Sequence, residues 1–306
     1  MNTPRDRGLP QQTWSPRYEV VLRKISFGGR LHVTPYRAIL DVPRELIWFV
    51  SRLLGAERRA RGTRKDTRLL TCYRQAVYGL VWFREKSDIP NLGRGFGLSQ
   101  ATSYRYLDEV IDVLAAEAPD LHEALERAKV EGMPHLILDG KVVDTDRLLV
   151  KTTSVKGKPI DLWYAGKTHD FGGNIQAIMS DRGIPLWVSD VLPGNVVDIT
   201  AARQLVLDIV RPFTAEMPIL ADPGYQGAGQ GIFTPVKQSK DGRELDVNTR
   251  TYNALLRSLR CLGERGFALL AQRWRTLQHV SLSPSRIGSI AKAALVLVHF
   301  EHGMIA

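Results

Sequence analysis

Two short apolar runs constrain this chain most, because each ends on an aspartate that is followed at once by a residue that breaks a strand. The first run reads HLILDG, residues 135–140, and places Asp139 before a glycine. The second reads PILADPG, residues 218–224, and places Asp222 before Pro-Gly. Short apolar runs bounded by turn-forming residues are typical of buried strands. We therefore predict two buried strands that end on Asp139 and Asp222.

If these strands are neighbours in one sheet, the two carboxylates share an edge of that sheet. Two anions in a partly dry site repel each other, so they need a proton or a cation between them. Hard oxygen donors without cysteine or suitable histidine nearby favour Mg²⁺ or Mn²⁺. The alternative is that each aspartate only caps a helix or forms a turn.

A third acid is available in RSLRCLGERGFALLAQRW, residues 257–274, where Glu264 is the only acidic residue. Arg260 precedes it by four positions, which puts both on one face of a predicted helix. Gly263 and Gly266 flank the glutamate, although each costs a helix about 1 kcal/mol relative to alanine, which indicates close packing against that face. Three such acids could hold two cations about 3.5–4 Å apart for in-line phosphoryl transfer. The alternative is an ordinary surface ion pair between Glu264 and Arg260.

Charge is spread unevenly along the 306 residues, whose formal net charge is +10. Residues 1–107 hold 20 Lys and Arg against 8 Asp and Glu, residues 108–131 hold 2 against 8, and residues 132–306 hold 20 against 16. A basic first third indicates a polyanionic partner, and nucleic acid is the simplest one. The alternative is that these arginines merely solvate the surface.

Residues 70–114 are predicted to form a helix-turn-helix, with apolar residues at helical spacing and a turn at Gly97. The alternative is that two helices joined by a glycine turn are an ordinary feature of a globular protein. Ser99 is a suitable N-cap for the second helix. Three polar side chains of this helix are expected to project outward toward base edges and phosphates of DNA: Gln100, Ser103 and Arg105.

The segment before this module is basic. Residues 1–16 are expected to be loosely ordered, and residues 18–54 to contain helical stretches interrupted by glycine and proline. The run ERRARGTRKDTR, residues 57–68, is dense in arginine and is predicted to contact phosphate, although such runs are usually solvated loops.

The body of the chain is expected to be a mixed α/β layer fold. An antiparallel meander with a hairpin turn at SDRG is followed by a helix entered at Asp198, by the strand that carries Asp222, and by one long helix from about Thr249 to Leu277. We therefore divide the chain into a basic helical and loop region (1–69), the helix-turn-helix with its connector (70–131) and an RNase H-like catalytic domain (132–306).

The bulk composition excludes several other classes. The two cysteines, Cys72 and Cys261, have no metal-ligand spacing, so a disulfide framework or zinc site is not expected and a reducing cytoplasm is the default compartment. The N-terminus lacks an apolar signal core, and the late run AKAALVLVHF is too short to span a bilayer. No membrane association is expected.

Taken together, the motifs resemble a known family. LILDGKVVDTDR, WYAGKTHDFGGNIQAIMSDRGIPLWVSDVLPGNVVDITAAR, ILADPGYQGAG and NALLRSLRCLGERGFALLAQRWRTL, in this order, look like a DDE-superfamily transposase of the bacterial insertion-sequence type, related to Harbinger-like endonucleases. Residues 70–114 look similar to the helix-turn-helix that precedes the catalytic domain in such proteins.

The resemblance implies an RNase H-like fold in which Asp139, Asp222 and Glu264 are the catalytic acids and hold two Mg²⁺ or Mn²⁺ ions. It implies that double-stranded DNA, as transposon ends and target, is cleaved and then joined through a freed 3′-hydroxyl. Synapsis of two ends implies at least a homodimer, acting at the nucleoid. Lys167, His169 and Asn174 are expected beside the predicted site. Lys167 and His169 are assigned to substrate phosphate together with Arg260, and the alternative for the first two is a plain surface role.

The chain departs from the family pattern in four places. Arg257 and Ala271 stand where the family signature around the third acid has tyrosine and lysine, Lys141 stands where threonine is usual, and Val197 stands where histidine is common. Two alternatives to an active transposase therefore remain open: a DNA-binding protein whose DDE body is inactive, and a host nuclease that cleaves DNA without transposition.

Overall fold

A computed structural model describes residues 40–154, 157–238 and 244–305 of the chain. The chain separates into two units, residues 1–41 and 42–306, and all described helices and strands belong to the second unit. The expected loose segment 1–16 and the helical stretches expected before residue 40 lie outside the described residues, as does the centre of the polar loop, residues 239–243.

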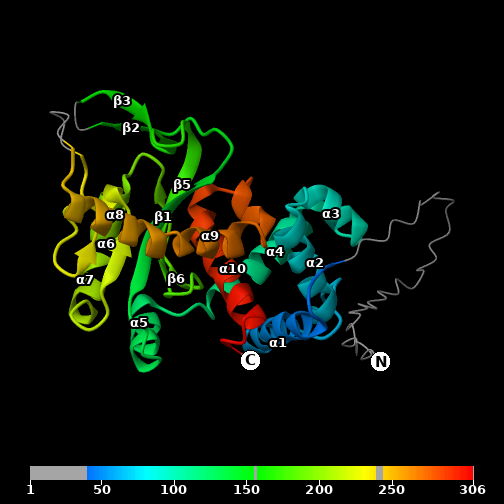
Figure 1. The fold of residues 1–306 in the computed structure, drawn as a ribbon. Coiled ribbons are helices and arrows are strands. Elements are labelled where there is room, and N and C mark those ends of the chain that lie inside the picture. The colour runs from blue at the N-terminus through cyan, green and yellow to red at the C-terminus, as the bar shows by residue number, and fades with distance from the viewer. Residues whose placement is uncertain (1–39, 155–156, 239–243, 306) are drawn as a thin grey trace, which may run out of the picture. The chain divides into compact units, whose positions relative to one another are not determined.

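Five α-helices come first in the described chain, and the strands begin only after α5 (Figure 1). The α-helices are α1 (Arg44–Ala60), α2 (Cys72–Glu85), α3 (Ile89–Gly95), α4 (Gln100–Ala115), α5 (Leu121–Val130), α6 (Asp198–Leu205), α7 (Leu207–Val210), α8 (Val247–Arg260), α9 (Leu262–Ala271) and α10 (Ile287–Glu301). Short 3-10 helices are η1 (Arg211–Phe213), η2 (Pro223–Tyr225), η3 (Arg275–Gln278) and η4 (Pro284–Arg286).

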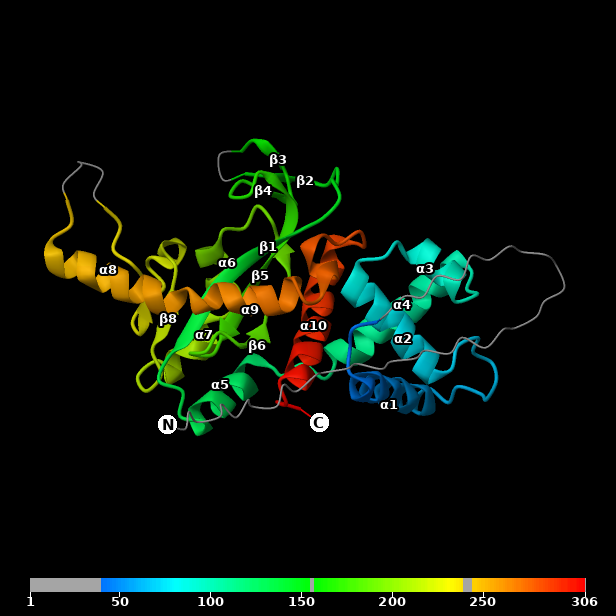
Figure 2. The same cartoon turned by 45° about the vertical axis from the view of Figure 1, so that its right-hand side comes forward.

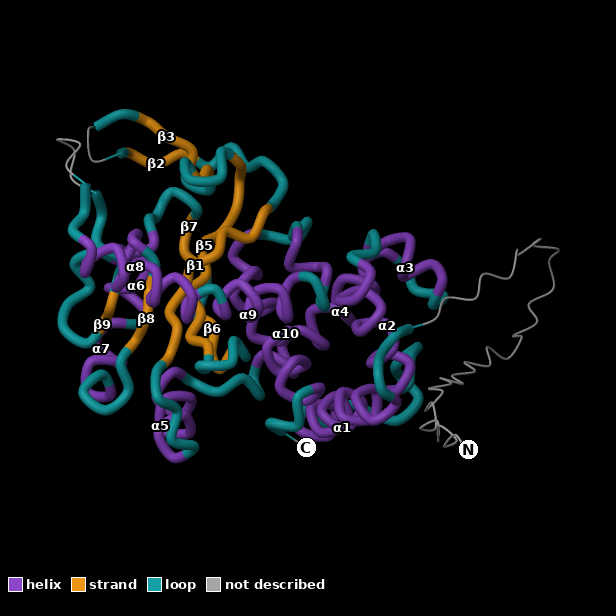
Figure 3. The backbone as a smooth tube through the Cα atoms, in the orientation of Figure 1, coloured by secondary structure: helices purple, strands orange, loops and turns teal. Residues whose placement is uncertain are grey.

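The described strands lie between α5 and α8 (Figure 3). They are β1 (Leu136–Asp144), β2 (Lys151–Thr153), β3 (Pro159–Asp161), β4 (Tyr164–Ala165), β5 (Asp170–Met179), β6 (Pro185–Val188), β7 (Leu192–Pro193), β8 (Ile219–Ala221) and β9 (Ile232–Phe233).

Helices α2, α3 and α4 begin at side-chain caps that the sequence supplies, whereas α1 begins after Pro43 without one. The hydroxyl of Thr71 accepts from Arg74 N–H at 3.2 Å, and the carboxylate of Asp88 accepts from Asn91 N–H at 2.9 Å. Ser99 caps α4, and the turn between α3 and α4 passes through Gly97 at a φ of +73°, which favours glycine. The expected short helix, glycine turn and second helix are therefore present.

The main sheet is mixed, as the sequence predicted. Its strands run in the order β4-β5-β1-β8-β9, with β6 and β7 also paired to β5. β1 is antiparallel to β5 and parallel to β8, and β8 is parallel to β9. The turn SDRG joins β5 to β6 as an antiparallel hairpin, with Gly183 at a φ of +73°.

Helices cover both faces of this sheet (Figure 2). Leu136, Leu138 and Ile219 point to one face and form a buried core with α5, α6 and α7. On the other face α9 lies across β1, and the strongly apolar α10 contacts both β6 and α4. The acidic side chains of Asp139 and Asp222 meet where β8 ends beside the middle of β1.

The long helical stretch expected from Thr249 to Leu277 is present as α8, α9 and the 3-10 helix η3, and the α-helix is interrupted at Cys261. α8 buries only Leu256, whereas α9 packs closely onto the sheet. A Cβ on Gly266 would lie 2.3 Å from Met179 Sδ, so glycine is what permits this approach. The expectation of close packing at the glycines beside Glu264 is therefore confirmed.

Within the described ranges, every helix is too short or too polar to cross a membrane.

Candidate active site

The parallel pairing of β1 with β8 brings the two predicted aspartates together. Leu138 pairs with Ala221 in the register, so Asp139 and Asp222 are the next residues on neighbouring strands. Asp222 follows the last residue of β8, as predicted. The prediction that Asp139 ends its own strand is wrong, because β1 continues to Asp144 through its pairing with β5. Asp139 instead lies in β1 at the level where β8 stops.

Each of these carboxylates uses one oxygen locally. Asp139 Oδ1 accepts a hydrogen bond from Gly140 N–H at 3.1 Å, and Asp222 Oδ1 accepts one from Gly224 N–H at 2.7 Å. The alternative interpretation, that Asp222 forms a turn or a cap, is also correct, because Asp222 caps η2. The Oδ2 atoms of both aspartates have no hydrogen-bond partner among the described residues.

Burial, and to a lesser extent the negative charge of Asp222, raise the pKa of Asp139 to about 6, although Arg260, the Gly140 N–H and Lys167 act in the opposite direction. A carboxyl group that costs free energy to ionise in its own fold is a candidate for a functional site. The charge that would favour its ionised form is a cation at the Oδ2 atoms.

Arg260 and Glu264, expected on one face of one helix, lie in different helices, because Arg260 ends α8 and Glu264 is in the first turn of α9. Arg260 is half-buried and is the strongest positive influence on Asp139. Glu264 is exposed near the start of α9, and no hydrogen bond or ion pair joins the two described side chains. The alternative of an ordinary Arg260–Glu264 ion pair is therefore wrong. The backbone beside Glu264 does reach the site, because a Cβ on Gly263 would lie 3.8 Å from Asp139 Oδ2.

The donor chemistry fits a divalent cation at two of the three acids. Among the residues that the structure describes, no three His, Cys, Asp or Glu side chains converge as metal ligands. Asp139 and Asp222 nevertheless offer hard carboxylate oxygens from adjacent backbone positions, which is the donor type that Mg²⁺ and Mn²⁺ prefer. Glu264 would have to turn from solvent toward this pair to complete the predicted triad.

Lys167 and His169 lie in the turn that joins β4 to β5. Lys167 Nζ donates to Asp198 Oδ2 at 2.9 Å. Burial alone would lower the pKa of Lys167, but the hydrogen bond to Asp198 and the charges of Asp198, Asp222 and Asp139 raise it above its ordinary value. His169 is exposed and has a φ of +58°. Lys167 is therefore electrostatically coupled to the acid pair.

The sequence did not predict the buried polar network that lies beside the acid pair. Asp198 Oδ1 accepts from Asn174 Nδ2 at 2.9 Å, Asn174 Oδ1 accepts from Gln176 Nε2 at 2.9 Å, and Gln176 Oε1 accepts from Tyr225 Oη at 2.6 Å. Asp198 was identified only as the start of a helix. The alternation of Asn174 and Gln176 in an otherwise apolar strand was the available signal, because both would face the same side.

The surface of α4 differs in part from the prediction. Gln100 and Arg105 are exposed, as expected. The expectation that Ser103 projects outward is wrong, because Ser103 is fully buried and its Oγ donates to Ser99 O at 2.9 Å. It packs against Gly93 of α3, where a Cβ would lie 1.8 Å from Ser103 Oγ. The small size of serine thus serves the contact between α3 and α4.

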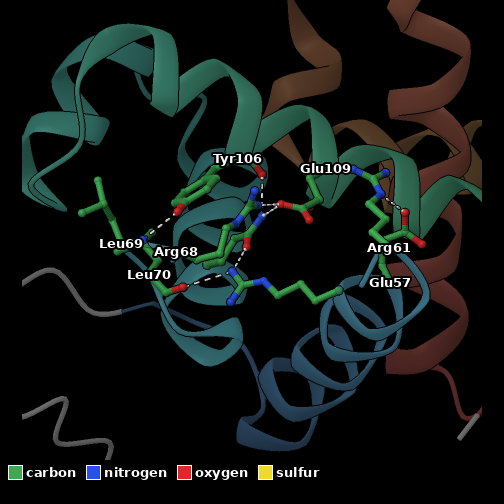
Figure 4. Close-up of polar contacts among 9 residues, drawn as sticks. Glu57, Arg61, Arg68, Leu69, Leu70, Tyr106 and Glu109 are labelled. Atoms are coloured by element: carbon green, nitrogen blue, oxygen red, sulfur yellow. Dashed lines mark hydrogen bonds and ion pairs between the residues drawn. The ribbon is translucent and has the colours of Figure 1, made fainter. Parts of the chain in front are cut away.

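Several arginines of the basic run 57–68 are engaged within the protein (Figure 4). Arg68 pairs with buried Glu109 of α4, and Arg61 pairs with Glu57. Arg58 donates to Leu70 O at 3.0 Å. The exposed cations of this run that make no ion pair with described residues are Arg59, Arg64 and Lys65, and the expected phosphate contact is restricted to them.

The four positions that depart from the family pattern have separate environments. Ala271 is buried in α9, and Arg257 is exposed on α8. The ammonium of Lys141 lies 5.9 Å from the centre of the Phe267 ring. Val197 is exposed just before α6 and provides no side-chain cap.

A mixed sheet that sets two aspartates side by side on parallel strands, with helices on both faces, is consistent with a nuclease domain. Residues 139–299 match the family described as DDE superfamily endonuclease, which covers more than half of the chain. The chain belongs to this family, whose members generally use divalent metals and whose substrate is DNA. Searches of curated proteins and of solved structures found no match to the chain.

Proposed function

We propose that this protein is a DNA transposase, a metal-dependent endonuclease and strand-transferase with an RNase H-like catalytic domain at residues 132–306. The observation that carries the proposal is the register of β1 and β8, which places Asp139 beside Asp222 inside a domain of the DDE endonuclease family. Each aspartate keeps one carboxylate oxygen free of hydrogen bonds to described residues, so both are available to a ligand.

Asp139 and Asp222 would hold the cations, and Glu264 would join them by rotating from its exposed position on α9. Two Mg²⁺ or Mn²⁺ ions bound there supply the chemistry of the reaction by activating a water and stabilising the leaving oxygen. The residues of the chain orient the phosphodiester. Lys167 presents its ammonium beside the acid pair, and His169 and Arg260 are the other proposed phosphate contacts.

The helical part of the chain would hold the DNA. We propose residues 70–131 as a helix-turn-helix module with its connector, in which Gln100 and Arg105 at the exposed start of α4 contact base edges or phosphates. Residues 1–69 would add nonspecific phosphate contact through exposed cations. Transposition joins two DNA ends, so a homodimer or larger assembly at the nucleoid is part of this proposal.

A second candidate is a DDE-derived protein that binds DNA without transposing it. Two observations favour it: Glu264 points to solvent, and the position of the family's lysine is the buried Ala271. A host nuclease of the same family would cleave DNA but would have no inverted repeats flanking its coding region, whereas a transposase gene would be flanked by them.

A plasmid-nicking assay tests the proposal. The purified protein is expected to nick supercoiled DNA with Mg²⁺ or Mn²⁺ and to stop when Asp222→Ala is introduced. Equal nicking by Asp222→Ala would contradict the site. Binding of DNA by the wild-type protein without any metal-dependent nicking would favour the second candidate.

A further inference from the structure

The buried carboxylate of Asp198 lies next to the acid pair but differs from it in how its oxygens are used. Both oxygens accept side-chain hydrogen bonds, Oδ2 from Lys167 Nζ and Oδ1 from Asn174 Nδ2, each at 2.9 Å. Asp139 and Asp222 each have one oxygen without such a partner among the described residues. A carboxylate whose two oxygens are both occupied is poorly placed to be a metal ligand, so Asp198 has another role.

The orientation of Asp198 is set by a rigid chain of polar groups. Asn174, held by Gln176, fixes the Oδ1 side of Asp198, and Gln176 in turn accepts from the fully buried Tyr225. These groups crowd around Gly140, where a Cβ would lie 2.6 Å from Asp198 Oδ1 and 2.8 Å from Tyr225 Oη. Gly140, which follows Asp139, therefore leaves the space that the network occupies directly beside the acid pair.

Lys167, in contrast to the buried Asp198, belongs to an exposed hairpin turn. Its side chain is 62% exposed, whereas that of Asp198 is 10% exposed. A lysine on a turn has a long flexible side chain, and fixing it costs conformational entropy. The ammonium has three donors, and among the described residues its one hydrogen bond goes to Asp198. The remaining donors are free for a phosphate.

We propose that Asp198 is a positioning residue that holds the Lys167 ammonium beside Asp139 and Asp222, where Lys167 contacts a phosphate of the bound DNA strand. The proposal rests on the proposed function, because the acid pair must be the place where DNA is bound. In this proposal the polar network around Asp198 places positive charge at the acid pair, and Asp198 is not a third metal ligand.

Duplex DNA binding measured in EDTA, where no strand is cut, separates positioning from simple charge. Asp198→Asn removes a negative charge near a polyanion, so charge alone predicts tighter binding. Positioning predicts binding weaker by about threefold to tenfold, because the ammonium is released from its place beside the acid pair. It also predicts that the salt slope, which is the slope of the logarithm of the binding constant against the logarithm of the salt concentration, falls in magnitude by about 0.9 for one lost phosphate contact. Lys167→Met is expected to reproduce both effects, and Lys167→Arg to restore part of the affinity.

A second carboxylate–lysine pair, between Glu216 of the catalytic domain and Lys129 of the connector, provides the control. Glu216 accepts from Lys129 Nζ at 2.9 Å, the same distance as in the Asp198 pair. It precedes β8, whereas Asp222 follows it, so this pair lies at the opposite end of the strand. Glu216→Gln is expected to leave the salt slope unchanged. A similar loss of slope in Glu216→Gln would show that the effect is not specific to the site.

Combining the variants distinguishes positioning from a structural role. If Asp198 acts through Lys167, Asp198→Asn weakens binding in the wild type but not in the Lys167→Met background. Additive weakening would overturn the proposal, as would an Asp198→Asn protein that binds as tightly as wild type. If Asp198→Asn does not fold, Lys167→Met still tests the proposal, because the altered side chain is exposed. An unchanged salt slope in Lys167→Met would overturn the proposal. A wild-type protein that neither binds nor nicks DNA would instead contradict the proposed function itself.

Discussion

Asp139 lies beside Asp222 because the parallel ladder of β1 and β8 ends with Leu138 opposite Ala221. The two acids come from positions 83 residues apart in the chain, and only the sheet makes them neighbours. Their closeness has a cost, since burial and the neighbouring charge raise the pKa of Asp139 to about 6.

Asp139→Asn is expected to stabilise the metal-free protein at neutral pH. A carboxyl with a raised pKa in the fold contributes stability below its unfolded value near 3.8, and this contribution is lost as pH rises through about 6. The substitution should therefore raise the free energy of unfolding at pH 7.5 by up to about 3 kcal/mol and have little effect near pH 3.5. Urea denaturation in EDTA measures this, with exposed Asp208→Asn as the control. A destabilised Asp139→Asn at pH 7.5 would contradict the argument.

His299 is expected to make the protein acid-sensitive. Burial lowers its pKa to about 4, although its hydrogen bond to Pro185 O, at 2.8 Å, acts in the opposite direction. Stability is present above the unfolded pKa near 6.5 and is lost as pH falls toward 4, by about 2 kcal/mol between pH 7 and pH 5. His299→Gln should flatten this part of the pH profile, whereas exposed His122→Gln should not. An unchanged profile in His299→Gln would refute the assignment.

Gly266→Ala is expected to destabilise the contact of α9 with the sheet. The new Cβ would meet Met179 Sδ at 2.3 Å and Cγ at 2.9 Å, and Met179 is fully buried. Overpacking typically costs about 1–3 kcal/mol, which outweighs the gain of about 1 kcal/mol in helix propensity. Gly55→Ala in α1, whose Cβ would meet nothing closer than 3.5 Å, should instead be stabilising. Thermal unfolding should show a lower melting temperature for Gly266→Ala and a higher one for Gly55→Ala. A stabilised Gly266→Ala would show that Met179 can move to accommodate the new methyl group.

Arg68→Ala is expected to destabilise the helical part of the protein, because it leaves the buried carboxylate of Glu109 without its cation (Figure 4). Breaking one side of a buried pair costs about 3–5 kcal/mol, an upper limit here because Arg68 is partly exposed and Gln75 also donates to Glu109. Exposed Arg64→Ala should leave the unfolding free energy unchanged. Denaturant titration of both variants checks this difference, and equal stability would mean that the Arg68–Glu109 pair does not persist in solution.

Arg105→Ala is expected to weaken duplex DNA binding and to reduce its salt slope by about 1, because Arg105 is exposed at the start of α4. Ser103→Ala should leave affinity unchanged, since Ser103 is buried against α3. Fluorescence anisotropy at several salt concentrations distinguishes the two. A Ser103 variant that stays folded but loses affinity would show that another face of the helix meets DNA.

Much of the local structure was predictable because it depends on neighbouring residues. The caps at Thr71, Asp88 and Ser99 and the turn at Gly97 follow from side-chain chemistry and glycine conformation. The interruption between α8 and α9 at Cys261 was not predictable from periodicity, because apolar residues continue at helical spacing across it.

By itself the sequence determined the acids at positions 139, 222 and 264, the strands that carry the first two, and the resemblance to DDE enzymes that the family match bears out. The tertiary structure decided which polar groups meet. It placed Asp139 beside Asp222, left Glu264 in solvent, buried Ser103, and joined Asp198 to Lys167 across 31 residues. The physical reason is that pairing register and helix packing depend on the whole core, whereas strand, cap and turn signals are local.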